Sequence, residues 1–243
     1  MISAKSIQEE YRRHLNRIYA DADQRINVID ADGFINEAID LVFENYAIKF
    51  ESNSFLRNTL RQLEVKKYKY KPKNITKVDK DTSKINYPDR FYLLTRQSLT
   101  ACKDGCTDEK NLDLAMLQSS DLNSALRDPN WEPSFEWEQA LVEDAGDSLY
   151  IYHNCKFKIK EVEIDYLMKP NHIATPSLIK NGASYIKDGK TITSDINFEM
   201  DSTFFWRKAV AVAVLLTQRA LGDVTDFQTQ FQVILGLDKL NLN

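Results

Sequence analysis

Apolar residues recur at helical spacing near the N-terminus of the chain. Ile7, Tyr11 and Leu15 follow one another at four-residue intervals, which is typical of one face of an amphipathic helix. A second helical segment runs from Gly33 to about Glu51 and has a wider apolar face. Asp32 precedes this segment, and we expect it to cap the helix, because an aspartate there can accept bonds from free backbone N–H groups.

The wide face of the second helix is a candidate interface. A helix that is apolar on more than one side needs more than one neighbour. We therefore expect part of this face to dock on another copy of the chain or on another protein. The candidate residues are Phe34, Ile35, Ile39, Val42 and Tyr46.

The C-terminal part of the chain also has helical periodicity. The segment Thr203 to Leu221 predicts a long helix, and Gly222 is a natural stop. Ala209 to Leu216 is apolar all round, so this helix is expected at the centre of a core. A last helix is predicted from about Thr225 to Leu235.

Strand patterns and turn signals fill the middle of the chain. We divide the sequence into helices at 1–65, a lysine-rich arm or loop at 66–87, a β-rich region at 88–200 and C-terminal helices at 201–243 that pack with the N-terminal ones. Helices on both sides of a β-rich block predict an α+β fold, with a central antiparallel β-sheet or sandwich.

In the segment Phe157 to Met168 the apolar residues change from odd-numbered to even-numbered positions. Phe157 and Ile159 share one parity, whereas Val162, Ile164 and Tyr166 share the other. Side chains of a strand alternate between faces, so a regular strand cannot direct all five into one core. We therefore predict a β-bulge near Lys160 and Glu161.

The segment from Lys66 to Lys84 carries eight lysines. One hypothesis is phosphate contact, with tyrosines that stack on bases or belong to an interface. The other is a solvated arm or a charged edge strand that resists unwanted pairing. The candidate DNA contacts are Lys66, Lys67, Lys69 and Lys71, and the two tyrosines are Tyr68 and Tyr70.

Composition and charge are those of an ordinary globular protein. Of the 243 residues, 43% are hydrophobic and 28% charged, and the net charge is −4. This balance leans against a protein whose main task is to grip nucleic acid. The longest apolar run, Ala209 to Leu216, is much shorter than the roughly 20 residues of a membrane span.

No established motif for chemistry is present. The chain lacks phosphate-binding, dinucleotide-binding, nucleophile-elbow and zinc-protease motifs. Cys102, Cys106 and Cys155 are odd in number, and the first two have the wrong spacing for a zinc site. We expect no enzyme, metal or cofactor, although carboxylates from distant segments could still form a site. Trp131 and Trp137 are either binding anchors or, as we prefer, aromatics that pin a loop to the sheet.

Several segments, in order, resemble ring proteins of the head-to-tail connectors of short-tailed phages, particularly the crAss-like group. They are FINEAIDLVFENYAIKFE and FLRNTLRQL near the start, YLLT, a DP…PS segment and IDYLMKP in the middle, and FFWRKAVAVAVLLTQRAL near the end. The lysine-rich stretch 66–84 and the loop 177–190 depart from the pattern.

This resemblance implies a structural virion protein without catalytic residues. Such proteins form a closed ring, often of twelve copies, below the portal. They extend the DNA channel, touch DNA without reading its sequence and dock the next tail component. The implied partners are the chain itself, the portal and neighbouring tail or ring proteins, with assembly in the host bacterial cytoplasm. The alternative is a phage nucleic-acid-binding accessory protein that uses Lys66 to Lys84.

Overall fold

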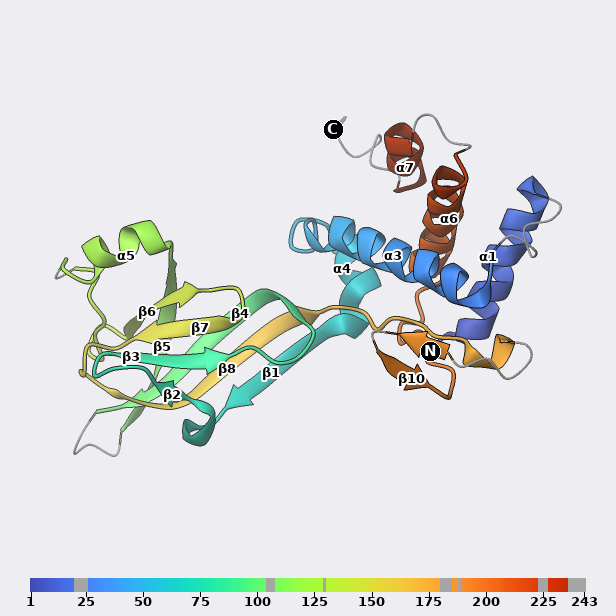
Figure 1. The fold of residues 1–243 in the computed structure, drawn as a ribbon. Coiled ribbons are helices and arrows are strands. Elements are labelled where there is room, and N and C mark those ends of the chain that lie inside the picture. Colours follow the sequence, from blue (N-terminus) through green and yellow to red (C-terminus); the bar gives the residue numbers. More distant parts are fainter. Residues whose placement is uncertain are drawn as a thin grey trace. The chain divides into compact units, whose positions relative to one another are not determined.

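The chain folds into two compact units. The computed structural model describes residues 1–19, 26–103, 108–128, 130–179, 185–187, 189–222 and 227–235. One unit comprises Met1–Leu63 and Lys169–Asn243, and the other comprises Glu64–Met168. We call them the helical unit and the sheet unit (Figure 1). The predicted α+β class is confirmed. The predicted β-rich region 88–200 is not one unit, because residues 169–200 belong to the helical unit.

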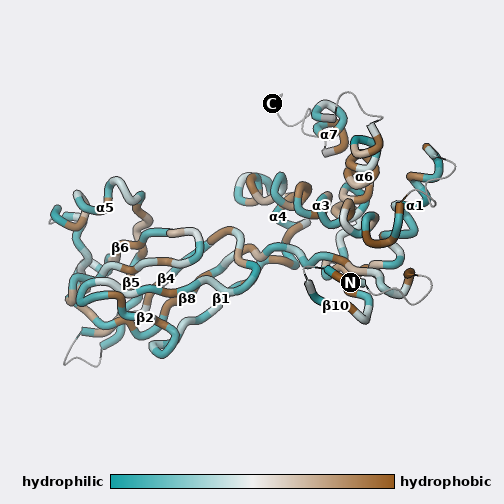
Figure 2. The backbone as a smooth tube through the Cα atoms, in the orientation of Figure 1, coloured by the Kyte–Doolittle hydropathy of each residue, from teal (hydrophilic) through white to brown (hydrophobic). Residues whose placement is uncertain are grey.

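The helical unit has α6 at its centre. This helix packs against α3 and α1, so one C-terminal helix packs with two N-terminal ones. Its middle is strongly hydrophobic (Figure 2) and is buried from Val212 to Thr217. No helix in the described part of the chain is long and apolar enough to cross a bilayer. The elements are α1 (Ala4–Ile18), α3 (Val28–Ala47), α4 (Ser54–Leu60), the 3₁₀ turns Arg61–Leu63 and Pro176–Leu178, β9 (Tyr185–Lys187), β10 (Lys190–Ile192), α6 (Thr203–Ala220) and α7 (Phe227–Leu235).

The helix caps differ in part from the prediction. Asn27, not Asp32, caps α3, and its side-chain oxygen accepts the Asp30 amide at 2.8 Å. Asp32 lies one turn inside the helix and is fully buried, so its prediction as a cap is wrong. At α6 the Ser202 hydroxyl accepts the Phe205 amide at 3.3 Å. Gly222 follows with φ +82°, the left-handed conformation expected beyond a helix C-terminus.

The face of α3 that was expected to be an interface is largely inside the helical unit. The neighbouring helices α6 and α1 cover it, which leaves no room for a second protein there. This corrects the expectation for Ile35, Ile39, Val42 and Tyr46, which are 0%, 1%, 0% and 3% exposed. Phe34 is half-buried and remains accessible.

The sheet unit is one eight-stranded sheet in the order β1-β8-β4-β5-β6-β7-β3-β2. Adjacent strands of this sheet pair antiparallel, except β5 and β6, which are parallel. The sheet is therefore mixed and not purely antiparallel. The elements are β1 (Glu64–Tyr70), the 3₁₀ turn Pro72–Asn74, β2 (Thr76–Lys77), β3 (Thr82–Asn86), β4 (Phe91–Cys102), β5 (Glu109–Leu117), α5 (Ser119–Ala125), β6 (Gln139–Asp144), β7 (Ser148–Tyr152) and β8 (Lys158–Met168).

The predicted bulge in β8 is confirmed. Opposite β4, Thr100 pairs with Glu161 and Ala101 pairs with Ile159, so Lys160 is the extra residue. The bulge restores the parity of the strand. All five apolar side chains on either side of it belong to, or pack against, the same core: Phe157, Ile159, Val162, Ile164 and Tyr166.

The predicted lysine-rich arm is mostly part of this sheet. Residues 64–70 form the edge strand β1, and further strands follow at 76–77 and 82–86. The register of β1 against β8 shifts between Val65 and Tyr68, and Lys67 has φ 55°. A charged edge with a bulge resists pairing with another sheet, so the edge-strand interpretation holds for Lys66 to Tyr70.

Candidate functional site

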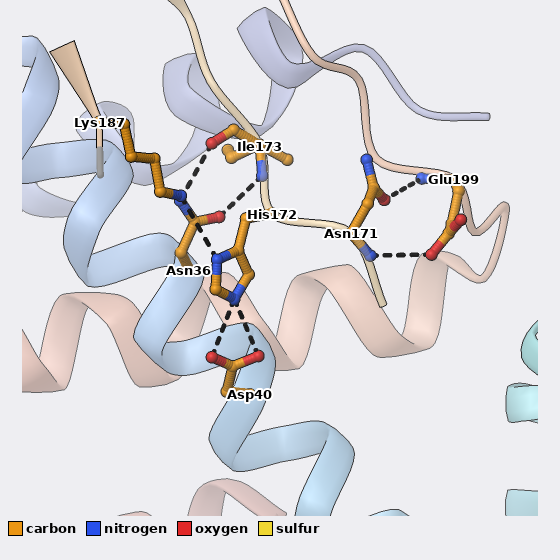
Figure 3. A network of polar contacts seen from close by, with 7 residues as sticks. All are labelled: Asn36, Asp40, Asn171, His172, Ile173, Lys187 and Glu199. Atoms are coloured by element: carbon orange, nitrogen blue, oxygen red, sulfur yellow. Dashed lines mark hydrogen bonds and ion pairs between the residues drawn. The ribbon is translucent and has the colours of Figure 1, made fainter. Parts of the chain in front are cut away.

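One face of α3 carries a ladder of three polar side chains. Asp32, Asn36 and Asp40 stand four residues apart, so they lie above one another on the helix. Each makes hydrogen bonds to the segment His172–Thr175, part of which appears in Figure 3. We call these three residues the α3 ladder.

Asp32 forms the buried end of the ladder. Its carboxylate accepts the Thr175 amide at 2.8 Å, the Thr175 hydroxyl at 2.9 Å and the Tyr185 hydroxyl at 2.9 Å. Gln8 of α1 donates a further bond at 3.0 Å. Burial raises the pKa of Asp32 because it disfavours the charged form, while the four donors oppose that shift.

The other two members of the ladder hold the same segment further along the helix. The Asn36 amide bonds both the N–H of Ile173 at 2.8 Å and its carbonyl at 3.0 Å. The Asp40 carboxylate accepts His172 Nε2 at 2.9 Å, and His172 Nδ1 lies 3.4 Å from Lys187 Nζ (Figure 3). With Nε2 as the donor to Asp40, Nδ1 is the acceptor that faces the ammonium group of Lys187.

The α3 ladder therefore acts as a clamp. It fastens the chain directly after the sheet unit ends at Met168. The donors and acceptors of the ladder face one another and are used by the fold. The further polar contact of the His172–Asp40 pair is the ammonium group of Lys187, which is neither a hydroxyl nor a thiol nucleophile. Sequence reasoning missed this cluster. Its only local signal is the four-residue spacing of the polar side chains, and nothing local shows that residues 172–175 lie against them.

A second polar cluster lies in the sheet unit near the turn between β7 and β8. His153 is 7% exposed, and its Nε2 lies 3.2 Å from the Ser83 hydroxyl. Its Nδ1 accepts the Cys155 amide at 3.3 Å, so no carboxylate orients the ring as in a catalytic triad. Burial lowers the pKa of His153. Since Ser83 is also buried, this arrangement stabilises the turn and presents no open nucleophile.

The cysteines show no sign of activation where the structure describes them. Cys102 is buried, and Cys155 is an exposed thiol that donates to the carbonyl of Lys80 at 2.8 Å. A hydrogen bond with Asp81 raises the pKa of Cys155, the opposite of what a nucleophilic thiolate needs. Cys106 lies outside the described residues. Within the described ranges, no three His, Cys, Asp or Glu side chains are grouped to hold a metal ion.

The candidate DNA contacts are exposed on β1 and beside it, but two of them have carboxylate partners. Lys69 Nζ lies 2.6 Å from Glu161 and 3.5 Å from Glu163, and Lys66 Nζ lies 3.3 Å from Glu64. The backbone N–H of Lys67 donates to Asp165 at 2.6 Å. Lys71 is exposed at the end of the strand. A phosphate would have to compete with the carboxylates for Lys66 and Lys69.

The two candidate tyrosines differ in exposure. Tyr70 is 5% exposed, and its hydroxyl donates to the carbonyl of Asn86 at 2.8 Å. It belongs to the core of the sheet unit, which corrects its assignment as an interface or stacking residue. Tyr68 is 39% exposed and contacts the rings of Tyr70 and Tyr166, so part of its ring is covered.

Two of the three aromatic residues before β6 are exposed. Phe135 is buried and pins the loop, as predicted for the group. Trp131 and Trp137 instead are 52% and 84% exposed, so the preferred interpretation is wrong for both tryptophans. The alternative, an exposed binding anchor, fits Trp137, whereas Trp131 lines the groove beside α5.

No protein-family model matches the chain, and no curated protein is similar to it at a significant level.

Proposed function

We propose that this chain is a structural subunit of a closed homo-oligomeric ring in the head-to-tail connector of a short-tailed phage. The proposal rests on the ordered resemblance of its segments, from FINEAIDLVFENYAIKFE to FFWRKAVAVAVLLTQRAL. By that resemblance, about twelve copies form a collar below the portal, extend the DNA channel and dock the next tail component. The subunit then belongs to the virion.

A structural observation that supports the proposal is the exposure of large apolar side chains on both units. The sheet unit exposes Trp137 at 84%, and the helical unit exposes Ile48 at 79% and Phe55 at 54%. Isolated exposed apolar residues are ordinary, but exposed aromatics on a fixed loop are typical of interfaces. A ring with head-to-tail contacts needs two different surfaces on every subunit, and each unit supplies candidates for one.

The placement of the polar groups supports the same proposal. The most deeply buried ones, such as Asp32 and Thr175, bond one another and hold the chain together. The net charge of −4 suits a channel wall along which DNA must slide, since a strongly basic wall would retain phosphates.

The direct test is the assembly state of the full chain, alone and with portal. Size-exclusion chromatography with light scattering gives the mass, and negative-stain images give the symmetry. We expect closed rings, either free or seated on the portal. A chain that stays monomeric under both conditions contradicts the proposal. A salt-sensitive shift of DNA at low ionic strength would instead favour the accessory-protein alternative.

A further inference from the structure

Trp137 stands at the tip of a tight loop. Ser134 and Gln139 close its base with two backbone hydrogen bonds, at 2.8 and 2.9 Å. The Trp137 amide donates to the Ser134 hydroxyl at 3.3 Å, while the side chain is 84% exposed. A large aromatic on a backbone that is already ordered loses little conformational entropy when it docks.

Ion pairs hold the loop on both sides of this indole. Glu136 pairs with Lys103, and Glu138 pairs with Lys110 at 3.0 Å. The Lys110 ammonium also lies 5.3 Å from the centre of the buried Phe135 ring. Each exposed pair is weak on its own, but the two together limit how far the loop can swing. The loop is therefore built to present one apolar side chain to the outside.

The helical unit contains an apolar groove that suits such a side chain. It lies between the first turns of α3 and the end of α6 and has a volume of about 610 Å³. Its wall includes Gly33, and a Cβ built on Gly33 meets nothing within 4 Å. The apolar lining is Ile26, Ile29, Phe34, Ala220 and Leu221, and the polar lining is Asp30, Glu37 and Thr217.

The polar atoms of this groove complement an indole. The indole N–H is only a donor, so it needs an acceptor at the edge of an apolar site. Asp30 and Glu37 supply carboxylates there. The groove at Phe204 offers Arg207 and Lys208 instead.

Two further grooves fit an indole less well. The one at Ile18 has His14 and Arg17 as its polar lining. The one beside α5 is smaller, at about 260 Å³, and already has Trp131 in its wall.

We propose that Trp137 of one copy inserts into the α3–α6 groove of the next copy in the ring. The inference rests on the proposed function. A protruding side chain on the sheet unit and a groove on the helical unit are two different surfaces, as the head-to-tail contact of a ring requires. A buried Trp supplies about 150–250 Å² of the roughly 800 Å² per partner in a stable interface. Trp137 is thus the anchor of a larger contact.

Matched variants of the full chain test the contact from both sides. Trp137→Ala removes the side chain that inserts, and Gly33→Trp fills the groove. Gly33→Ala leaves most of the groove open, and Trp131→Ala removes the other exposed indole of the same unit. Ring formation is followed against protein concentration by light scattering and imaging, with circular dichroism to confirm folding. We expect Trp137→Ala and Gly33→Trp to raise the concentration for assembly by about 30-fold or more, as for other buried aromatic anchors. The two controls should stay near wild type.

Crosslinking identifies the partner of residue 137 directly. A benzophenone amino acid replaces Trp137, and this chain is mixed with ¹⁵N-labelled wild-type chain under conditions that assemble the wild type. Mass spectrometry should find crosslinks between copies to peptides that contain residues 26–37 or 217–221. Crosslinks only within one chain, or only to other surfaces, overturn the inference.

The two proposals fail in different ways. If Trp137→Ala and Gly33→Trp form rings at the wild-type concentration, the inferred contact is wrong while the ring remains. If the wild type forms no ring alone or on the portal, the ring proposal fails, and the contact fails with it.

Discussion

Replacing Asp32 with alanine should destabilise the helical unit selectively. Four donor groups face this carboxylate, from Gln8, the Thr175 amide, the Thr175 hydroxyl and Tyr185. In the variant Gln8 keeps the Val28 carbonyl and the Thr175 hydroxyl as acceptors. The Thr175 amide, the Thr175 hydroxyl and the Tyr185 hydroxyl lose their acceptor in a buried site.

The magnitude follows from these three donors. A buried donor without a partner costs about 1–3 kcal/mol, so the three together cost about 3–9 kcal/mol in free energy of unfolding. The alanine also removes the desolvation penalty of the carboxylate, which offsets part of the loss. We therefore expect a net loss of about 2–4 kcal/mol. Asp30→Ala is the matched control. This residue lies on the same helix but is exposed, and its loss should stay below about 1 kcal/mol.

Tryptophan fluorescence during urea unfolding can separate the two units. Trp206 lies on α6 of the helical unit, whereas Trp131 and Trp137 lie in the sheet unit. A chain with Trp131→Phe and Trp137→Phe reports the helical unit, and a chain with Trp206→Phe reports the sheet unit. Asp32→Ala should shift only the Trp206 transition. A loss below about 1 kcal/mol, or an equal shift of both transitions, would refute the clamp role of the α3 ladder.

Two further predictions concern pH and the bulge. Burial raises the pKa of Asp32, so the folded state binds a proton more readily than the unfolded state. Between this raised pKa and the ordinary carboxyl pKa, a falling pH should therefore stabilise the wild type relative to Asp32→Asn. Urea unfolding at stepped pH checks this, and a constant difference contradicts it. Deleting Lys160 removes the bulge and directs the buried Phe157 and the partly buried Ile159 to the wrong face, at a cost of about 2–5 kcal/mol. Lys160→Ala keeps the bulge and should cost less than about 1 kcal/mol. Similar melting of both variants by circular dichroism would contradict the parity argument.

The sequence predicts those features of this fold that depend on local periodicity. The parity change between Ile159 and Val162 is sufficient to place the bulge in β8. The all-round apolar stretch Ala209 to Leu216 correctly predicts a central helix, because such a surface cannot face water. These predictions succeed since strand alternation and helical spacing act within a few residues.

The features that the sequence does not predict depend on contacts between distant segments. Asp32 resembles a helix cap in sequence, yet its partners Thr175 and Tyr185 lie more than 140 residues away. Residues 169–200 have little periodicity of their own, so their place in the helical unit is set by the α3 ladder and not by local propensity. Likewise, Ile35 and Val42 can be recognised as apolar, but only the position of α6 shows that the chain itself covers them.

The two crossings between the units lie side by side. Glu64 opens the sheet unit and pairs with Leu167, one residue before the unit ends. Partners in an antiparallel ladder have Cα atoms about 5 Å apart, so the chain enters and leaves the sheet unit at adjacent positions. A segment whose two ends are adjacent can be exchanged for a different domain, or for a short turn, without a change in the path of the helices. Related chains could therefore change what they contact while keeping the same helical unit.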